Sequence, residues 1–135
     1  MTKKIKILVA EDETDIRELI AFTLKNIGGY EVVKASNGAD AVAKVEELLA
    51  GGDRLPDLIL MDVRMPKMTG YDACAKLKEK DETRPIPVVF LSAKGQEQEI
   101  ETGLKVGAVD YILKPFAPDD LIKSVDKILR EQGIR

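Results

Sequence analysis

The 135-residue sequence contains no histidine and only one cysteine, Cys74. The absence of histidine excludes catalysis by an imidazole base and the binding of a metal through imidazole nitrogen. A single cysteine excludes both an intrachain disulfide and a metal cluster held by several thiolates. Any metal site in this chain therefore has oxygen ligands. The sparing use of cysteine also predicts a reducing compartment, of which the cytoplasm is the simplest.

Long apolar runs are missing as well. None approaches the roughly 20 residues that a membrane-spanning helix needs, so no membrane partner is expected. The first ten residues, MTKKIKILVA, are basic and then apolar, as in a signal peptide. However, the apolar part is short, and Glu11 and Asp12 follow it at once. This segment is therefore interpreted as the first strand.

Neither sign of charge is in large excess. The 21 Lys and Arg residues against 24 Asp and Glu residues give a net charge of −3, which does not favour nucleic acid as a direct partner. Hydrophobic residues make up 44% of the chain and charged residues 33%, a composition typical of a folded domain with a solvated surface. The length predicts one such domain.

Short apolar runs alternate with helical patterns along the chain. Gly28-Gly29 and Gly51-Gly52 are expected to end the first two helices, and Asn37 to cap the start of the second. This alternation predicts an α/β protein, a three-layer, doubly wound (βα)5 domain with helices on both faces of a parallel five-stranded sheet. The expected strands are residues 5–10, 30–35, 57–61, 86–92 and 109–113. The apolar stripes of the helices after them are Ile16, Ile20, Leu24 and Ile27; Ala41, Val45, Leu48 and Leu49; Tyr71, Cys74 and Leu77; Ile100 and Leu104, in a helix from about Gln96; and Leu121, Val125 and Ile128.

Polar side chains gather at the ends of these strands. Glu11 and Asp12 follow the first strand, Asp62 the third and Lys114 the fifth, while Ser92 ends the fourth. In an open α/β sheet, ligands bind beyond the carboxyl ends of the strands. Three carboxylates in one cleft repel one another unless a hard divalent cation neutralises them, and oxygen ligands suit Mg²⁺ or Mn²⁺. A metal site at this edge of the sheet is therefore expected.

The same residues suit the chemistry of phosphate. Mg²⁺ commonly shares its shell with a phosphoryl group, to which Ser92 can donate and with whose charge Lys114 can pair. Asp62 beside a metal is chemically suited to be a nucleophile, because carboxylates form acyl phosphates. The alternative interpretation of Asp62 is a turn or helix cap, the commonest role of an aspartate after a strand.

Further residues complete a recognisable combination. The full set is Glu11-Asp12, Asp62, Met65-Pro66, Gly70, Ser92-Ala93 and Lys114-Pro115. This combination resembles the receiver domain of bacterial two-component response regulators, especially the stand-alone chemotaxis regulators, and the resemblance covers nearly the whole chain. It implies a flavodoxin-like fold with strand order 2-1-3-4-5. It also implies that residues 1–135 form a single receiver domain without an output domain.

The resemblance implies a role for each residue of the expected metal site. Asp62 would be the phosphorylated residue and would also bind the metal. Asp12 would bind Mg²⁺ directly, and Glu11 would support the metal shell through water. The backbone carbonyl of Arg64 would be the third protein ligand. Both Arg64 and Lys94 are long and basic, and they are expected to influence how water reaches the phospho-aspartate.

The resemblance also implies a switch. Ser92 would move toward the phosphoryl group, and Tyr111 would turn into the space it leaves. Lys114 would pair with the phosphate, and the Lys114-Pro115 peptide would be cis. The donor would be a sensor histidine kinase or a histidine phosphotransfer protein. The altered surface of the fourth helix, fifth strand and fifth helix would control an unknown downstream protein. The molecule would be a monomer or a weak phosphorylation-dependent dimer, and not a turnover enzyme.

Two other classes of function compete with this interpretation. A phosphohydrolase using an aspartyl phosphate typically carries a second aspartate two residues after the nucleophile, where this chain has Arg64. A flavin- or nucleotide-binding module would have a glycine-rich, phosphate-cradling loop after the first strand, where this chain has AEDETD at residues 10–15. Both alternatives are therefore disfavoured.

Overall fold

The computed structural model describes residues 4–93 and 97–135. They form a five-stranded sheet in which every neighbouring pair of strands is parallel. The order β2-β1-β3-β4-β5 is the one expected from the sequence. The strands are β1 (Lys6–Ala10), β2 (Glu31–Ala35), β3 (Leu58–Asp62), β4 (Val88–Ala93) and β5 (Asp110–Lys114).

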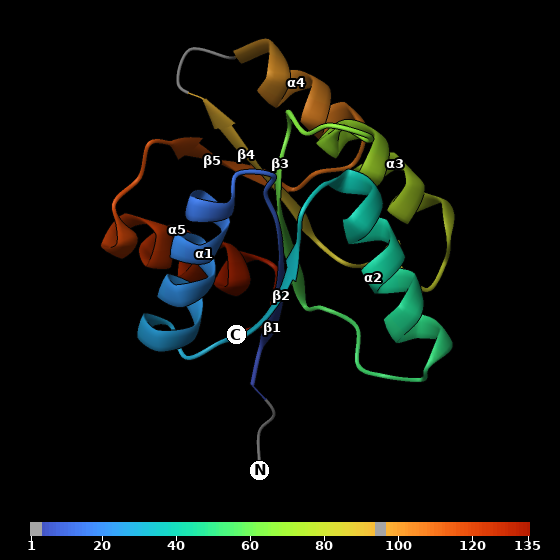
Figure 1. Ribbon diagram of the computed structural model, residues 1–135, viewed down its shortest axis with the longest axis horizontal. Helices are drawn as coiled ribbons and strands as arrows, with labels where there is room; N and C mark the ends of the chain where they lie inside the picture. The colour runs from blue at the N-terminus through green and yellow to red at the C-terminus, as the bar shows by residue number, and fades with distance from the viewer. Residues whose placement is uncertain (1–3, 94–96) are drawn as a thin grey trace.

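Helices cover both faces of the sheet and complete three layers. Figure 1 shows α1 and α5 together on one face, and α2 and α3 on the other. In the described parts of the chain, no helix has the length and apolar character needed to cross a membrane. The helices are α1 (Thr14–Phe22), the π-helical turn η1 (Thr23–Ile27), α2 (Gly38–Ala50), α3 (Gly70–Glu79), α4 (Glu97–Lys105) and α5 (Pro118–Glu131).

The central strands are buried on both faces, which explains their continuous apolar sequence. Successive side chains point to opposite sides. In β1, Ile7 and Val9 therefore pack under α1 and α5, while Leu8 and Ala10 pack under α2 and α3. Each face of the sheet thus has its own apolar layer, the first under α1 and α5 and the second under α2 and α3, and β3 is packed between them. Cys74 lies in the second layer and is fully buried, as expected for a small core residue.

The predicted helix ends are confirmed. The Asn37 side chain accepts a hydrogen bond of 2.8 Å from the backbone N–H of Asp40 and so caps α2. Gly29 and Gly52 follow the first and second helices with φ angles of 73° and 70°. Only glycine adopts this left-handed conformation without steric cost, so both helices end where the glycine pairs stand.

The apolar stripe predicted for the first helix is wrong at its last residue. Ile27 is 54% exposed, whereas Ile20 and Leu24 are fully buried. The helix ends in the π-helical turn η1, in which the Gly28 N–H donates to the Thr23 carbonyl five residues earlier. This wider turn rotates Ile27 off the buried face.

The stripe predicted for the fourth helix is also wrong at one position. Leu104 is 50% exposed, and the neighbouring Gly103 is buried against Phe90 of β4. A Cβ atom on Gly103 would lie only 2.6 Å from Cδ2 of Phe90. The helix therefore approaches the sheet through a glycine, which a search for apolar residues does not detect. The expected start at Gln96 lies outside the described residues, and α4 begins at Glu97.

Candidate functional site

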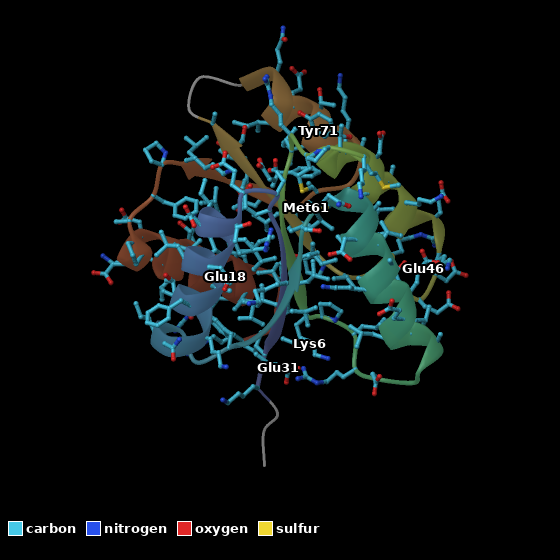
Figure 2. All side chains as sticks on the ribbon, in the orientation of Figure 1. Lys6, Glu18, Glu31, Glu46, Met61 and Tyr71 are labelled. Atoms are coloured by element: carbon cyan, nitrogen blue, oxygen red, sulfur yellow. The ribbon has the colours of Figure 1, made fainter. Side chains whose placement is uncertain are left out.

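The strand pairing brings the predicted acidic residues to one edge of the sheet. Asp62 is the last residue of β3 and pairs with Leu91 in β4. Met61, one residue earlier, pairs with Ala10, the last residue of β1, so Glu11 lies beside Asp62. In Figure 2 the labelled Met61 lies in the upper half of the molecule, and Lys6 and Glu31 mark the opposite end of the sheet.

Three carboxylates converge at this edge. Glu11, Asp12 and Asp62 each offer an oxygen atom, and the three atoms lie within 4.8 Å of one another. Glu11 is fully buried, Asp62 is half-buried and Asp12 is exposed, so the cluster opens to solvent on the Asp12 side. Hard anionic oxygens at this spacing fit a small divalent cation such as Mg²⁺, which keeps several water ligands.

The side chain of Lys114 contacts two of the three carboxylates. Its Nζ atom lies 2.7 Å from Oε1 of Glu11 and 3.2 Å from Oδ2 of Asp62. The ammonium group thus neutralises part of the negative charge that the carboxylates bring together. The peptide bond from Lys114 to Pro115 is cis, as predicted.

The backbone around Glu11 holds this residue in place. Its Oε2 atom accepts a hydrogen bond of 3.1 Å from the N–H of Glu13, and its own N–H donates to the carbonyl of Ala35 in β2. Its carbonyl oxygen accepts a bond of 2.8 Å from Arg17. The sequence did not single out Arg17, because an arginine one turn into a helix is an ordinary surface residue.

The local electrostatics favour a bound cation. Burial raises the pKa of Asp62 above its ordinary value, and the Asp12 charge adds to this effect, although Lys114 opposes it. Partial burial, followed by the adjacent Glu11, likewise raises the pKa of Asp12. Burial alone would lower the pKa of Lys114, but Glu11 and Asp62 outweigh it and the pKa is raised. The raised pKa values mean that the surroundings do not fully stabilise the ionised forms of the two aspartates, and a bound cation would stabilise them.

The two predicted switch residues lie on neighbouring strands. Ser92 is in β4, is only 2% exposed, and pairs with Leu113 in β5. Tyr111 is in β5 with its side chain 38% exposed, so it is not a simple core residue. The buried hydroxyl and the partly exposed ring thus lie on two directly paired strands at one side of the site.

The loop between β3 and α3 carries Arg64, two residues after Asp62. Further along, the N–H of Met68 donates to the carbonyl of Pro66 over 2.7 Å, and Lys67 between them has a φ angle of 68°. This tight γ-turn is rare, and a lysine gives no sequence signal for it. The loop ends at Thr69, whose side chain caps α3. Lys94, the other basic residue expected to influence the site, lies outside the described residues.

Residues 7–126 match the family described as the response regulator receiver domain. The chain belongs to this family. Receiver domains act as phosphoacceptors in two-component signalling and usually bind Mg²⁺ at such acidic clusters.

Curated relatives extend the match in sequence. The chain is 42% identical over 127 residues to the phosphate regulon transcriptional regulatory protein PhoB of Pseudomonas aeruginosa, covering 94% of this chain and 52% of that protein. The identity to PhoB of Escherichia coli is 40% over 125 residues, covering 93% and 52%. The chain thus spans about half the length of these relatives. The expectation of a receiver domain without an output domain stays a prediction.

Solved structures match the fold. The chemotaxis protein CheY4 of Vibrio cholerae superposes with a TM-score of 0.84 at 30% identity, covering 94% of this chain and all of that one. The receiver domain of NtrX from Brucella abortus gives 0.78 at 30% identity, covering 92% and 98%. These matches agree with the five parallel strands and their order, so the fold class expected from the sequence is confirmed.

Proposed function

We propose that this receiver domain accepts a phosphoryl group on Asp62 and thereby switches the surface that a partner protein recognises. The observation that carries the proposal is the convergence of Glu11, Asp12 and Asp62, with the ammonium group of Lys114 in contact with the first and the last. A structural cap would need none of these neighbours. Transfer of a phosphoryl group to a carboxylate is favoured by a divalent cation and by a fixed positive charge, both of which this cluster can supply.

The residues divide the work of the transfer. An oxygen of Asp62 forms the new bond to phosphorus, and the bond from phosphorus to the donor breaks with its electron pair leaving on the donor group. Lys114, already 3.2 Å from Asp62, pairs with the charge of the incoming phosphoryl group. Mg²⁺, or Mn²⁺, would be held by Asp12, Asp62 and the Arg64 carbonyl, with Glu11 acting through water. When bound, it supplies charge stabilisation.

The new phosphate then acts on the neighbouring strands. The Ser92 hydroxyl moves toward it, and the Tyr111 ring turns from its partly exposed position into the space that Ser92 leaves. This biases the surface formed by α4, β5 and α5. Among the described residues, four large apolar side chains already lie exposed on or beside these elements: Leu104, Val109, Tyr111 and Leu113.

The phosphoryl donor is a sensor histidine kinase or a histidine phosphotransfer protein, and the switched surface controls a downstream protein. The relatives named as transcriptional regulators indicate one kind of output, in a part of those proteins that this chain does not match. The free, buried thiol of Cys74 fits a reducing compartment such as the cytoplasm. Monomers, or weak dimers formed on phosphorylation, are the expected assembly states.

Phosphohydrolase activity is the competing function. It would need a general acid or base beside the acceptor, and the residue two positions after Asp62 is Arg64, whose guanidinium does not give up a proton. A receiver domain accepts one phosphoryl group per cycle and holds it. Slow loss of the group by hydrolysis is compatible with this role.

The test is incubation with acetyl phosphate and Mg²⁺, followed by intact-mass spectrometry. The native protein should gain the mass of one phosphoryl group, and Asp62→Ala should gain none. Removing Mg²⁺ with EDTA should prevent this gain in mass. No adduct on the native protein, an adduct on the variant, or many turnovers on a generic phosphomonoester would each overturn the proposal.

A further inference from the structure

The first helical residue of α2, Gly38, is buried against the loop that follows Asp62. A Cβ atom at this position would overlap the carbonyl oxygen of Met68 and lie 3.0 Å from the carbonyl oxygen of Thr69. Both obstacles are backbone atoms, which no change of rotamer can move away. The start of α2 therefore touches the loop at a distance that only glycine permits.

The loop is held from its other side as well. A Cβ atom on Gly70 would overlap the carbonyl oxygen of Asp62 and lie 3.1 Å from Cα of Val63. The N–H of Gly70 donates to the carbonyl of Val63 over 2.9 Å, closing the loop onto its own strand. The end of the loop, residues 68–70, is thus in close contact with α2 through Gly38 and with the end of β3 through Gly70.

Local hydrogen bonds restrain both segments of this contact, the start of α2 and the loop. The start of α2 is anchored by the Asn37 cap, which accepts a bond of 2.8 Å from Asp40. The carbonyl oxygens of Met68 and Thr69 lie beside the first turn of α2, where the positive end of the helix dipole favours them. Within the loop, the γ-turn at Lys67 leaves little freedom to absorb a displacement.

We infer that Gly38 is a positioning residue for the metal site. Because Gly38 has no side chain, α2 packs directly against the carbonyls of Met68 and Thr69. This contact fixes the position, relative to the sheet, of the loop that carries the Arg64 carbonyl, the expected third metal ligand. A side chain at position 38 pushes the loop outward and displaces that carbonyl from Asp12 and Asp62. The inference depends on the proposed function, because it assigns Gly38 a role in that same site.

The test compares two glycine-to-alanine variants of one helix. Gly38→Ala stands at the start of α2, and Gly51→Ala at its C-terminal cap, where the new Cβ would meet the movable side chain of Asp53 at 3.0 Å. Mg²⁺ affinity is measured by isothermal titration calorimetry on the unphosphorylated proteins, and folding by circular dichroism in urea. Gly38→Ala should bind Mg²⁺ about tenfold more weakly, as when a supporting contact of a metal ligand is lost. Gly51→Ala should bind as the native protein does.

The outcomes separate the inference from the proposed function. Mg²⁺ binding by the native protein, with equal affinity in a folded Gly38→Ala variant, would overturn the inference alone. No Mg²⁺ binding by the native protein would overturn both. A purely structural role for Gly38 would lower the urea midpoint and leave the Mg²⁺ affinity of the folded protein unchanged.

A second variant covers the case in which Gly38→Ala does not fold. Asn37→Ala removes the cap that holds the start of α2 against the loop, without adding an atom to the contact. It should remain folded and bind Mg²⁺ a few times more weakly than Gly51→Ala. Affinity equal to that of Gly51→Ala would overturn the inference.

Discussion

The Nζ atom of Lys114 lies 2.7 Å from Oε1 of Glu11, although 103 residues separate the two in the chain. Glu11 follows β1 and is fully buried, whereas Lys114 ends β5 and keeps 24% of its side chain exposed. The pair ties the two strand ends together across the floor of the acidic site. The lysine predicted to meet a phosphate therefore already has a structural partner.

Replacing Lys114 by methionine should destabilise the protein. The apolar stem is retained, but the buried Glu11 carboxylate loses its charged partner. Since Lys114 is partly exposed, we expect the free energy of unfolding at pH 7 to fall by about 1–3 kcal/mol, less than for a fully buried pair. Urea denaturation without added Mg²⁺ measures this.

The matched control is Lys80→Met, which removes an ion pair of 3.2 Å with Glu46 whose side chains are about half exposed. This change should cost at most about 1 kcal/mol. Equal losses in the two variants would contradict the importance of the Lys114 pair.

The stabilisation from Lys114 should also depend on pH. Its pKa is raised in the folded protein above the ordinary value of 10.5. The contribution of Lys114 to the free energy of unfolding is therefore complete at pH values below 10.5, and it is lost as the pH rises through the higher folded-state pKa. The stability difference between native protein and Lys114→Met should stay constant from neutral pH to about pH 10 and shrink above it.

Asp40→Ala should weaken the start of α2. The hydrogen bond from the Ser36 N–H, 2.9 Å long, lowers the pKa of Asp40, and Lys44 adds to the effect. We expect a loss of about 0.5–1 kcal/mol at pH 7 by urea denaturation. A carboxyl whose pKa is lowered in the folded protein stabilises the folded state at pH values above its ordinary pKa of 3.8. This contribution disappears as the pH falls through the lower folded-state pKa.

The variant and the native protein should therefore become equally stable in strong acid. A difference that persists at about pH 2 would show that Asp40 acts through packing and not through its charge.

Gly103→Ala should destabilise the protein even though alanine favours helices. The added Cβ would lie 2.6 Å from Cδ2 of Phe90, and the Phe90 ring also touches Tyr71 edge-on with a centroid distance of 5.5 Å. Overpacking of a core typically costs about 1–3 kcal/mol, against a gain in helix propensity of at most about 1 kcal/mol. A net loss of about 1–2 kcal/mol is expected from thermal and urea denaturation.

Leu104→Ala is the control on the next residue. Because Leu104 is half exposed, its truncation should change the free energy of unfolding by no more than about 0.5 kcal/mol. If Leu104→Ala proved the more damaging of the two, α4 would face the sheet as the apolar pattern predicted and not as the structure has it.

Phosphorylation should protect the Tyr111 ring from solvent. The chain has three tyrosines and no tryptophan. Tyr30 is 3% exposed and Tyr71 is partly buried, whereas Tyr111, at 38%, is the most exposed of the three. Acrylamide quenching of tyrosine fluorescence therefore reports on Tyr111 more than on either other tyrosine. Quenching should fall on treatment with acetyl phosphate and Mg²⁺, because the ring turns inward.

Two variants check the assignment. Tyr111→Phe should show weaker quenching than the native protein, from Tyr71, and this quenching should not change on treatment. Ser92→Ala should accept the phosphoryl group yet keep the quenching of the untreated protein. A native protein that gains the phosphoryl mass without any change in quenching would contradict the proposed coupling of Ser92 to Tyr111.

Much of the fold could be predicted because it depends on local pattern. The continuous apolar residues of β3, the glycine pairs after two helices and the Asn37 cap each act over a few residues. Right-handed crossover connections between parallel strands then restrict the arrangement to helices on both faces. The predictions for Ile27 and Leu104 were wrong, because a π-helical turn and a glycine contact changed which side of each helix is buried.

The three carboxylates and Lys114 were named from the sequence, since they stand at the ends of three strands and parallel strands bring such ends to one edge. Residue types and order along the chain were sufficient for that. Arg17, which donates to the Glu11 carbonyl, was not named. Which atoms meet was not predictable, because it depends on how separate elements pack. The Lys114–Glu11 pair and the contact of Gly38 with the Met68 carbonyl join segments far apart in sequence, and only the packed sheet and helices bring them within a few ångströms.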